Sequence, residues 1–466
     1  TTKNKNRRVE MKKKLVSLLL TATMVMGVLS GCGNGKMSVS QTGDTSTDEK
    51  VEMTAADDVD GTTITFWHSM GGVNGQAIDT LVNKFNEENE YGITVEAQYQ
   101  GEYDDSLNKL KSAQIGNMGA DLVQVYEIGT RFMIESGWVV PMQEMVDADN
   151  YDVSQIEPNL AAYYTIDDKL YSMPFNSSTP IMYYNKDMFA QAGITEVPDS
   201  LEGISKIGDQ LMNQGGASEV MSLGIYGWFF EQFVGKQGLD YANNGNGRDD
   251  VATAVDFDKN GAAKNILTAW QTLNQEGYAP IVGKGGDAGL ADFSAGKSAI
   301  TLGSTASLKQ ILQDVNGKFE VGTAYFPKIK ESDEGGVSIG GASLWALNNQ
   351  DPKKLRATWE FVKFLISPES QAYWNAQTGY FPVTTAAHEE QTFKDNIAQY
   401  PQFQTAIDQL HDSSPEYCGA LLSVFPEARA TVESEIESML NGKESVDEAV
   451  TNMADTINKS IDDYNT

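Results

Sequence analysis

Polar and aromatic side chains follow three successive predicted strands, each directly after the point where the strand ends. Trp67 and His68 follow the first strand, Glu102 and Tyr103 follow the second, and Glu127 follows the third. A carboxylate accepts hydrogen bonds from hydroxyl groups, and a tyrosine offers both a hydroxyl and an apolar ring face. Glycines beside these residues let a ligand approach the backbone closely. Together these residue types predict a cleft that binds a small polar molecule.

The same carboxylates leave a hydrolytic function open as a lesser alternative. A glycoside hydrolase needs two facing carboxylates, and Glu127 could pair with Glu102 or Asp104. No G-x-S-x-G elbow supplies a nucleophilic serine, and His68 is the only histidine near the predicted cleft. We therefore expect no catalytic residues. Turnover of a glycoside would support the alternative, a secreted enzyme that acts on polysaccharide.

Strands and helices that alternate along the chain must position these side chains. Short β runs are predicted at 63–66, 93–99 and 122–126, with helical stretches at 78–85 and 107–113 between them. In the first helical stretch, apolar residues recur at intervals of three and four, which places them on one face. This β-α-β-α-β order predicts a parallel sheet covered by helices. Ligands of such sheets bind beyond the carboxyl ends of the strands, where the three loops lie.

Length and composition narrow the class of protein further. The chain has 466 residues, 34 basic and 65 acidic, and a net charge of −31. This length fits about three average domains or two large lobes. A second α/β pattern runs from about 181 to 300, and helices dominate from 352 onward. The acidic balance argues against nucleic acid, whose phosphates require Lys and Arg patches, and against polybasic binding to a membrane surface.

The few cysteines and histidines exclude several kinds of site. Two cysteines, Cys32 and Cys418, are too few for a disulfide framework or for a cysteine-based zinc or iron–sulfur centre. Three histidines leave little for a histidine-rich metal site. We therefore expect neither a metal ion nor a cofactor.

The N-terminus is typical of a bacterial export signal. Basic residues at 12–14 precede an apolar run at 15–29, which is shorter than a membrane-spanning helix. Met11 is the natural start under this interpretation, so that residues 1–10 are a misassigned extension. We expect residues 1–31 to be a signal peptide that is removed on export.

The residues directly after the signal predict a lipid anchor and a tether. Leu29-Ser30-Gly31-Cys32 resembles a lipobox, in which Cys32 is lipidated after cleavage before it. Residues 32–61 begin with this cysteine and are then rich in Gly, Ser, Thr and Asp, which is typical of a flexible linker. We therefore expect an exported protein that a lipid holds at the outer face of the bacterial cytoplasmic membrane, without a membrane-spanning segment.

Six short runs of residues form a combination that points to one known family. They lie at 66–70, 124–127, 174–180, 183–187, 339–345 and 378–382. These runs resemble the family 1 extracellular solute-binding proteins of bacterial ABC importers, and in particular the members that bind glycerol 3-phosphate. The Ser-Ser-Thr-Pro and Gly-Gly-Ala-Ser-Leu-Trp segments are the specific ones. The resemblance covers most of residues 62–460 and is thin between about 190 and 289.

The resemblance implies an α/β protein with the two-lobed periplasmic-binding-protein type II fold and a ligand cleft between the lobes. Crossing strands join the lobes, which close on the ligand like a hinge and so present one shape to the membrane permease. Carried over to this sequence, lobe 1 is 62–174 plus 304–366, and lobe 2 is 178–302 plus 367–466. Both lobes are thus discontinuous in sequence. We also expect a monomer.

The resemblance further implies a set of ligand contacts. The matching residues are Tyr103, Glu127, Ser178, Ser304, Gly341 and Tyr380. In this set Glu127 accepts hydrogen bonds from ligand hydroxyl groups, the serines and Tyr380 donate to phosphate oxygens, and Gly341 lets its backbone N–H approach. We therefore expect the substitution Glu127→Gln to weaken binding while leaving stability nearly unchanged.

Two positions depart from the family pattern. The family's phosphate-binding arginine falls at Leu421, whereas Arg429 matches a second family arginine, to which we assign a structural role. A buried phosphate without an Arg or Lys partner is unfavourable. Residues 225–230 also match poorly with the family's ligand wall of two tryptophans, although Trp228 can serve in it.

These observations lead to one leading function and one alternative within the same class. The leading hypothesis is an extracellular substrate-binding lipoprotein that captures glycerol 3-phosphate or a related glycerophosphodiester and delivers it to the permease subunits of an ABC importer. The alternative keeps the transport role with a sugar or oligosaccharide as cargo. The leucine at 421 and the acidic surface favour a neutral cargo, whereas the matching Ser, Gly and Tyr positions favour the phosphate. The stacking faces for a sugar would come from Trp67, Trp228, Phe229 and Tyr380.

Overall fold

The structure, a computed structural model, describes residues 51–115, 119–348 and 350–466. The described residues form one compact unit. The predicted signal peptide, Cys32 and most of the predicted linker lie outside the described residues. Strands and helices alternate through the first half of the described chain, and helices dominate from Pro352 onward, as the sequence predicts. No helix in this part of the chain is both long and apolar enough to cross a membrane.

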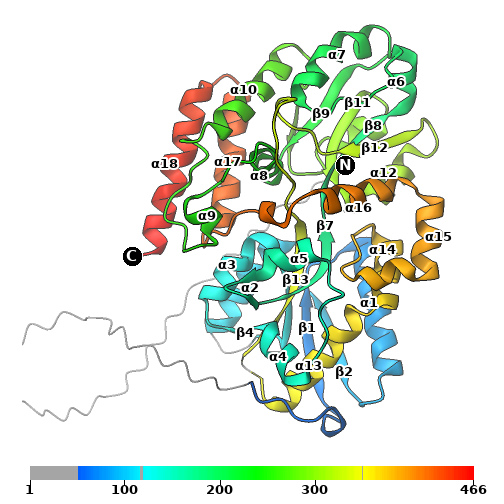
Figure 1. Cartoon of the computed structure of the whole chain (residues 1–466), viewed down its shortest axis with the longest axis vertical. Helices are drawn as coiled ribbons and strands as arrows, with labels where there is room; N and C mark the ends of the chain where they lie inside the picture. Colours follow the sequence, from blue (N-terminus) through cyan, green and yellow to red (C-terminus); the bar gives the residue numbers. More distant parts are fainter. Residues whose placement is uncertain (1–50, 116–118, 349) are drawn as a thin grey trace, which may run out of the picture. The chain divides into compact units, whose positions relative to one another are not determined.

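The first of two main sheets has six strands and lies in the lower half of Figure 1. They are β1 (Thr63–His68), β2 (Thr94–Tyr99), β3 (Leu122–Tyr126), β4 (Val139–Val140), β7 (Met173–Ser178) and β13 (Gly340–Leu347). The order is β2-β1-β3-β13-β4, and β7 pairs with β13 off this path. β1 is parallel to β2 and β3, whereas β13 is antiparallel to β3, β4 and β7. The predicted parallel sheet is thus confirmed for its first three strands and becomes mixed at β13.

The burial of β1 follows the two-residue period of a strand. Phe66 and His68 are buried, whereas Trp67 between them is half-buried on the opposite face. Phe66 packs edge-on against Phe361, with 5.6 Å between the ring centroids. β3 is buried along its whole length, as expected for a central strand that is covered on both faces.

Helices cover the first sheet with their apolar faces. In the first of them, the residues at 78, 81, 82 and 85 are buried, which confirms the predicted helical face. Tyr103 opens the second, so this predicted loop residue lies at the start of a helix. The helices around this sheet are α1 (Gly72–Glu88), α2 (Tyr103–Ile115), α3 (Thr130–Glu135), α4 (Met142–Asp149), α5 (Pro158–Tyr164), α13 (Pro352–Leu365) and α14 (Pro368–Thr378), with a small hairpin of β5 (Thr165–Ile166) and β6 (Lys169–Leu170) beside them.

The second sheet has five strands in the order β10-β9-β11-β8-β12 and lies in the upper half of Figure 1. They are β8 (Pro180–Asn185), β9 (Glu219–Ile225), β10 (Ile281–Lys284), β11 (Ser298–Ser304) and β12 (Val321–Tyr325). β9 is parallel to β10 and β11, whereas β8 is antiparallel to β11 and β12. The surrounding helices are α6 (Lys186–Ala192), α7 (Leu201–Asn213), α8 (Gly227–Lys236), α9 (Asn243–Gly247), α10 (Ala262–Gln275), α11 (Leu290–Ser294) and α12 (Leu308–Val315).

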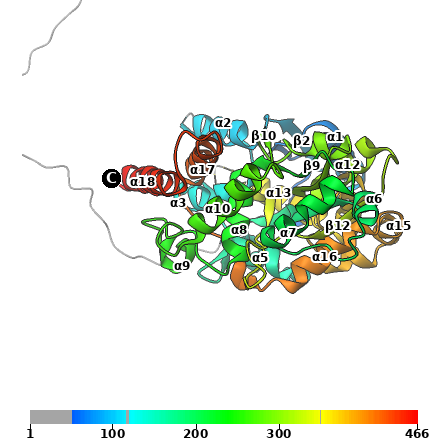
Figure 2. The same cartoon turned by 90° about the horizontal axis from the view of Figure 1, so that it is seen from above.

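The C-terminal part of the chain is helical and packs on both sheets. α17 (Phe425–Leu440) and α18 (Val446–Tyr464) lie side by side and contact α10, as Figure 2 shows from above. α16 packs against β12 of the second sheet. The remaining elements are η4 (Thr385–Glu389), α15 (Gln391–Gln399), α16 (Gln402–Asp412) and η5 (Pro415–Tyr417).

The chain passes between the two sheets at closely spaced points. β7 ends at Ser178 and β8 begins at Pro180, so only Thr179 separates a strand of one sheet from a strand of the other. The segment after α14 also reaches this place, because the N–H of Phe381 donates to the carbonyl oxygen of Ser177 (2.8 Å). These connections are short, as a hinge between two lobes requires.

The strand pairs bear on where one lobe ends and the other begins. Residues 308–325 fall in predicted lobe 1, yet β12 pairs with β8 of the second sheet. Residues 368–378 fall in predicted lobe 2, yet α14 packs against α1 of the first sheet. We therefore propose that residues 308–325 belong to lobe 2 and residues 368–378 to lobe 1. The reason is that a segment belongs to the lobe whose sheet it packs against.

The last part of the predicted linker has defined contacts. Val59 is fully buried, and the N–H of Thr54 donates to the carbonyl oxygen of Pro352 (3.4 Å). η1 (Ala56–Asp58) packs against α13. Residues 51–61 thus belong to the folded body, although the composition predicts a flexible tether there, and the linker that we propose lies upstream of them.

Candidate functional site

A cavity of about 860 Å³ opens at the ends of strands from both sheets. One wall holds residues 69–72 after β1 and residues 126–127 at the end of β3. The opposite wall holds Ser304 at the end of β11, Gly286 and Asp287 before α11, and Leu290 and Ala291 within it. The structure brings seven of the eight predicted contact residues to this cavity, namely Tyr103, Glu127, Ser178, Trp228, Ser304, Gly341 and Tyr380.

Tyr103 is held by a chain of buried amide groups. The N–H of Ser69 donates to Oε1 of Gln124 (2.8 Å), and Nε2 of Gln124 donates to Oδ1 of Asn176 (2.6 Å). Nδ2 of Asn176 then donates to the Tyr103 hydroxyl (2.8 Å). The Tyr103 ring stacks on Tyr126, with 5.3 Å between centroids. Burial raises the pKa of Tyr103 well above its usual value, so its hydroxyl keeps a proton that it can donate to a ligand.

Tyr380 offers a second fixed hydroxyl. Its ring stacks on Trp374 (5.8 Å between centroids), and its carbonyl oxygen accepts a hydrogen bond from Nδ2 of Asn375 (2.8 Å). Burial raises the pKa of Tyr380. The hydroxyl therefore stays protonated at neutral pH and is another donor on the cavity wall.

The serines and the glycine of the predicted set lie at strand ends. Ser304 ends β11, and its Oγ accepts the N–H of Ala306 (3.1 Å), which leaves the hydroxyl proton free to donate. Ser178 ends β7 and is buried. Gly341 has a φ of +94°, and an added Cβ would lie 2.0 Å from the carbonyl oxygen of Asn176. Only glycine lets β13 run this close to β7.

The two predicted tryptophans have different positions. Trp228 lies at the start of α8, lines the cavity and donates through Nε1 to the carbonyl oxygen of Ile339 (3.4 Å). Trp67 is not among the lining residues, and its Nε1 donates to Oε1 of Gln98 (3.1 Å). Side chains alternate along a strand, so Trp67 leaves β1 on the face opposite to His68.

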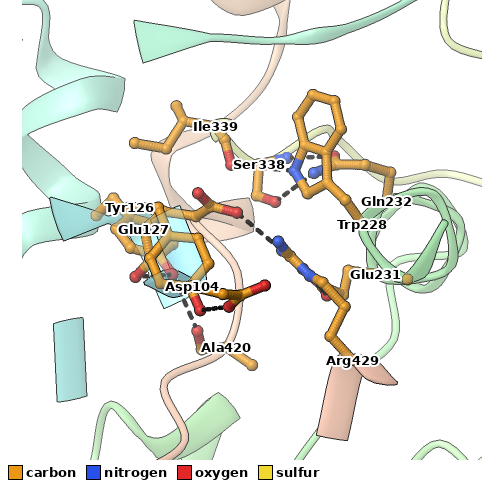
Figure 3. A network of polar contacts seen from close by, with 12 residues as sticks. Asp104, Tyr126, Glu127, Trp228, Glu231, Gln232, Ser338, Ile339, Ala420 and Arg429 are labelled. Atoms are coloured by element: carbon orange, nitrogen blue, oxygen red, sulfur yellow. Dashed lines mark hydrogen bonds and ion pairs between the residues drawn. The ribbon is translucent and has the colours of Figure 1, made fainter. Parts of the chain in front are cut away.

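Two carboxylates hold an arginine at the wall of the cavity, as Figure 3 shows. Nη2 of Arg429 donates to Oε1 of Glu127 and to Oε2 of Glu231, both at 2.8 Å, and Nε donates to Oε1 of Glu231 at 2.8 Å. Glu127 comes from η2 (Glu127–Gly129) after β3, Glu231 from α8 and Arg429 from α17. The guanidinium also lies over the Tyr226 ring, 5.6 Å from its centroid. The ion pairs thus join elements of both sheets.

The pKa directions follow from this burial and pairing. Burial alone would lower the pKa of Arg429, but the carboxylates of Glu231 and Glu127 raise it well above its usual value. Burial raises the pKa of Glu231, and the Arg429 guanidinium opposes this shift. The guanidinium is therefore charged at neutral pH, and it faces two carboxyl groups rather than one.

Two positions near the C-terminus bear on how a phosphate would be held. We assigned Arg429 a structural role, which its ion pairs with Glu127 and Glu231 fit, and the family's phosphate-binding arginine falls at Leu421. Leu421 is buried in the core, where its N–H donates to the carbonyl oxygen of Asn246 (2.8 Å). Arg429 instead lines the cavity. A usable signal was present, because a carboxylate that directly follows a buried strand, as Glu127 does, needs a cation near it if it is buried.

The cavity wall is acidic overall. Its charged residues are Glu102, Glu127, Asp287, Asp314 and Arg429. Asp104, one of the two possible partners of Glu127 in a hydrolase, accepts a hydrogen bond from the Tyr126 hydroxyl (2.5 Å). Among the described residues no group of three His, Cys, Asp or Glu side chains could hold a metal ion. The arrangement offers hydroxyl donors, carboxylate acceptors, one guanidinium and aromatic faces, which together suit binding of a polar solute.

The family model and the similar proteins of known name point to the same family. The family described as "Bacterial extracellular solute-binding protein" matches residues 80–405. The chain is 35% identical over 413 residues to the sn-glycerol-3-phosphate-binding periplasmic protein UgpB of Salmonella typhimurium, which covers 86% of this chain and 92% of that protein. It is 33% identical over 402 residues to the Escherichia coli K12 protein of the same name, covering 84% and 90%.

Solved structures give the same fold at lower sequence identity. UgpB from Mycobacterium tuberculosis, in complex with glycerophosphocholine, matches with a TM-score of 0.73 and 22% identity, covering 87% of this chain and 99% of that one. The GacH receptor of Streptomyces glaucescens, solved without ligand and with acarbose, matches with a TM-score of 0.71 and 21% identity, covering 86% and 99%. The predicted α/β fold of the two-lobed periplasmic-binding-protein type is thereby confirmed.

Proposed function

The chain belongs to the bacterial extracellular solute-binding proteins, and from this premise we propose that it captures a glycerol phosphate ester and delivers it to the permease of an ABC importer. Like its relatives, it is a binding protein and not an enzyme. The ester that we propose is glycerol 3-phosphate or a glycerophosphodiester. The observation that carries this proposal is the set of seven matching residues around one cavity, together with Arg429 on its wall.

The chemistry of the wall suits both ends of such a solute. Glu127 accepts hydrogen bonds from glycerol hydroxyl groups, and Tyr103 covers the carbon chain with its ring. Ser178, Ser304 and Tyr380 can donate to phosphate oxygens. Arg429 supplies a charged donor on the cavity wall, so a phosphate does not depend on an arginine at position 421.

A sugar remains the alternative cargo, and one observation favours it. Aromatic residues gather on one part of the wall, where Tyr226, Trp228 and Phe229 line the cavity next to one another. Such rings offer stacking faces to a pyranose. The GacH receptor, whose structure includes acarbose, shares the fold.

Calorimetric titration of the purified protein separates the two cargoes. The panel contains glycerol 3-phosphate, glycerophosphocholine, glycerophosphoglycerol, and neutral mono- and oligosaccharides. Binding of a glycerol phosphate ester with a micromolar or lower Kd supports the proposal, and the variant Arg429→Gln should then lose most of that affinity. Binding of neutral sugars alone assigns the sugar alternative and contradicts the phosphate.

The cellular setting that we propose rests on the sequence before the described residues. The protein is exported, in keeping with its family, and we propose that Cys32 carries a lipid that holds it at the outer face of the cytoplasmic membrane. We also propose that it acts as a monomer and that its two lobes close on the solute before docking to the permease. Mass spectrometry of the N-terminal peptide tests the anchor, since Cys32→Ala should abolish the acyl modification and release the protein from membranes.

A further inference from the structure

Arg429 on the cavity wall carries one positive charge but is hydrogen-bonded to two carboxyl groups. Three of its hydrogen bonds, each at 2.8 Å, go to carboxylate oxygens of Glu127 and Glu231. No hydrogen bond among the described residues engages Nη1 of Arg429. Nη1 is therefore the part of the guanidinium that is left for a solute. One positive charge thus meets two carboxyl groups before any solute arrives.

Glu231 differs from Glu127 in where it lies. Glu127 lines both the solute cavity and a separate cavity of about 100 Å³, whereas Glu231 lies behind the guanidinium and lines only the smaller one. Its two oxygens form a bidentate pair with Nε and Nη2 of Arg429. This geometry fixes the direction of the guanidinium and cancels its charge without contact to the solute.

The rest of the wall adds negative charge. Glu102, Asp287 and Asp314 line the cavity, and none of the described lining residues is a lysine. A phosphate monoester carries a charge of roughly −1.5 to −2 at neutral pH because its second pKa is about 6. A phosphodiester carries only one negative charge over the same range. The second charge of a monoester therefore meets repulsion that no lining cation offsets.

From these charges we propose that the cavity selects glycerophosphodiesters over phosphate monoesters, and that Glu231 is the positioning residue that sets this preference through Arg429. The inference rests on the proposed function, because it assumes that a glycerol phosphate ester is bound. The second substituent of the diester then lies toward the carboxylates of Asp287 and Asp314, which suit a hydroxylated or cationic head group. The cavity of about 860 Å³ is near the top of the range of about 300–1,000 Å³ typical of drug-sized ligands, so there is room for this group.

Titrations at two pH values test the charge argument directly. Glycerol 3-phosphate and glycerophosphoglycerol are titrated at pH 8, where the monoester is a dianion, and at pH 5, where it is mostly a monoanion. At pH 8 we expect the diester to bind about tenfold more tightly or better, which corresponds to about 1.4 kcal/mol. At pH 5 this ratio should fall to less than about threefold, because the ligand's second charge is gone. Burial raises the pKa of Asp287, so acid also weakens the repulsion from the wall, which lowers the ratio in the same direction.

The variant Glu231→Gln identifies the residue that sets the ratio. It keeps the shape of the side chain and an oxygen for Arg429, but it removes one negative charge. We expect the affinity for the monoester at pH 8 to rise about tenfold while the affinity for the diester changes less than about threefold. A merely structural role would weaken both ligands alike. Glu427→Gln, an exposed carboxylate on the same helix as Arg429, is the matched control and should leave the ratio unchanged.

The outcomes separate this inference from the function on which it rests. If monoester and diester bind equally at pH 8 and Glu231→Gln changes neither, the charge preference is refuted while the proposed function stands. If neither ester binds at either pH, the proposed function fails and the inference with it. Retained diester binding by Glu231→Gln shows that the variant is folded, so a change in the ratio cannot be ascribed to unfolding.

Discussion

A side-chain carbon placed on Gly227 would lie 2.3 Å from Cγ of Arg429. The N–H of the same glycine donates to Oε1 of Glu433 (2.9 Å), so α8 begins in contact with α17. The absence of a side chain at this position therefore allows the arginine to reach the cavity wall.

Gly227→Ala should accordingly displace the Arg429 side chain. We expect affinity for the phosphate ester to fall about tenfold or more, and the free energy of unfolding to fall by about 1–3 kcal/mol from overpacking. Calorimetry and urea denaturation measure the two effects. Gly235→Ala is the control on the same helix, because its added carbon would meet only the carbonyl oxygen of Gly336 at 3.2 Å. Equal loss of solute affinity in both variants would contradict the role of Gly227.

Glu127→Gln should weaken solute binding while leaving the protein stable. The amide accepts weaker hydrogen bonds from hydroxyl groups than a carboxylate does, so we expect about tenfold lower affinity for a diester or a sugar. Glu231 keeps its bidentate pair with Arg429, so the free energy of unfolding should change by about 1 kcal/mol or less. Calorimetry and urea denaturation of the same preparation decide the point. Comparable losses of binding and folding would show that Glu127 is structural.

Gly341→Ala should be one of the more destabilising glycine substitutions. Its positive φ disfavours alanine, and the added carbon would lie 2.0 Å from the carbonyl oxygen of Asn176. We expect a loss of about 3 kcal/mol or more in the free energy of unfolding, measured with urea. Gly277→Ala separates the two causes, since Gly277 also has a positive φ (+77°) but no atom within 4 Å of the added carbon. Its loss should be about 1 kcal/mol.

His68 should make the protein less stable in acid. Burial lowers its pKa to about 4, and nearby Asp79 opposes this shift only in part. The ordinary histidine pKa is about 6.5, so between about pH 4 and pH 6.5 this histidine is protonated in the unfolded chain but neutral in the folded protein. The stabilisation from neutral His68 is complete above about pH 6.5 and is lost as the pH falls toward 4. It amounts to about 3 kcal/mol.

Urea denaturation between pH 7 and pH 4 measures this loss. His68→Gln keeps an acceptor for the N–H of Met70, which donates to Nδ1 of His68 at 3.3 Å, but it cannot be protonated. The stability advantage of the natural protein over this variant should therefore shrink as the pH falls. An advantage that stays constant across the range would refute the assignment.

The local elements and most of the cavity were predictable from the sequence. The period of β1 and the spacing of apolar residues in α1 are local signals, and glycines with polar residues after strands mark the carboxyl edge of a sheet. The resemblance to the family then supplied Ser178, Ser304 and Gly341, which lie far apart in the chain and carry no local signal of their own.

The remaining features depend on long-range geometry. Arg429 reaches the cavity only because Gly227 leaves space and Glu231 directs the guanidinium, and no spacing along the chain reveals that contact. Trp67 lies within β1 rather than after it, and the pleat of the strand directs its side chain away from the cavity. The placement of β12 is set by its pairing with β8, and α14 follows its packing against α1, which sequence patterns do not report.

The position of β13 in the first sheet has a consequence for how the protein is made. β13 lies between β3 and β4, but β3 ends at Tyr126 and β13 begins at Gly340. The ribosome therefore releases every strand of the second sheet before the strand that completes the first. Pairing across so long a stretch of chain is slow. The first sheet therefore stays incomplete until the chain has been made as far as β13.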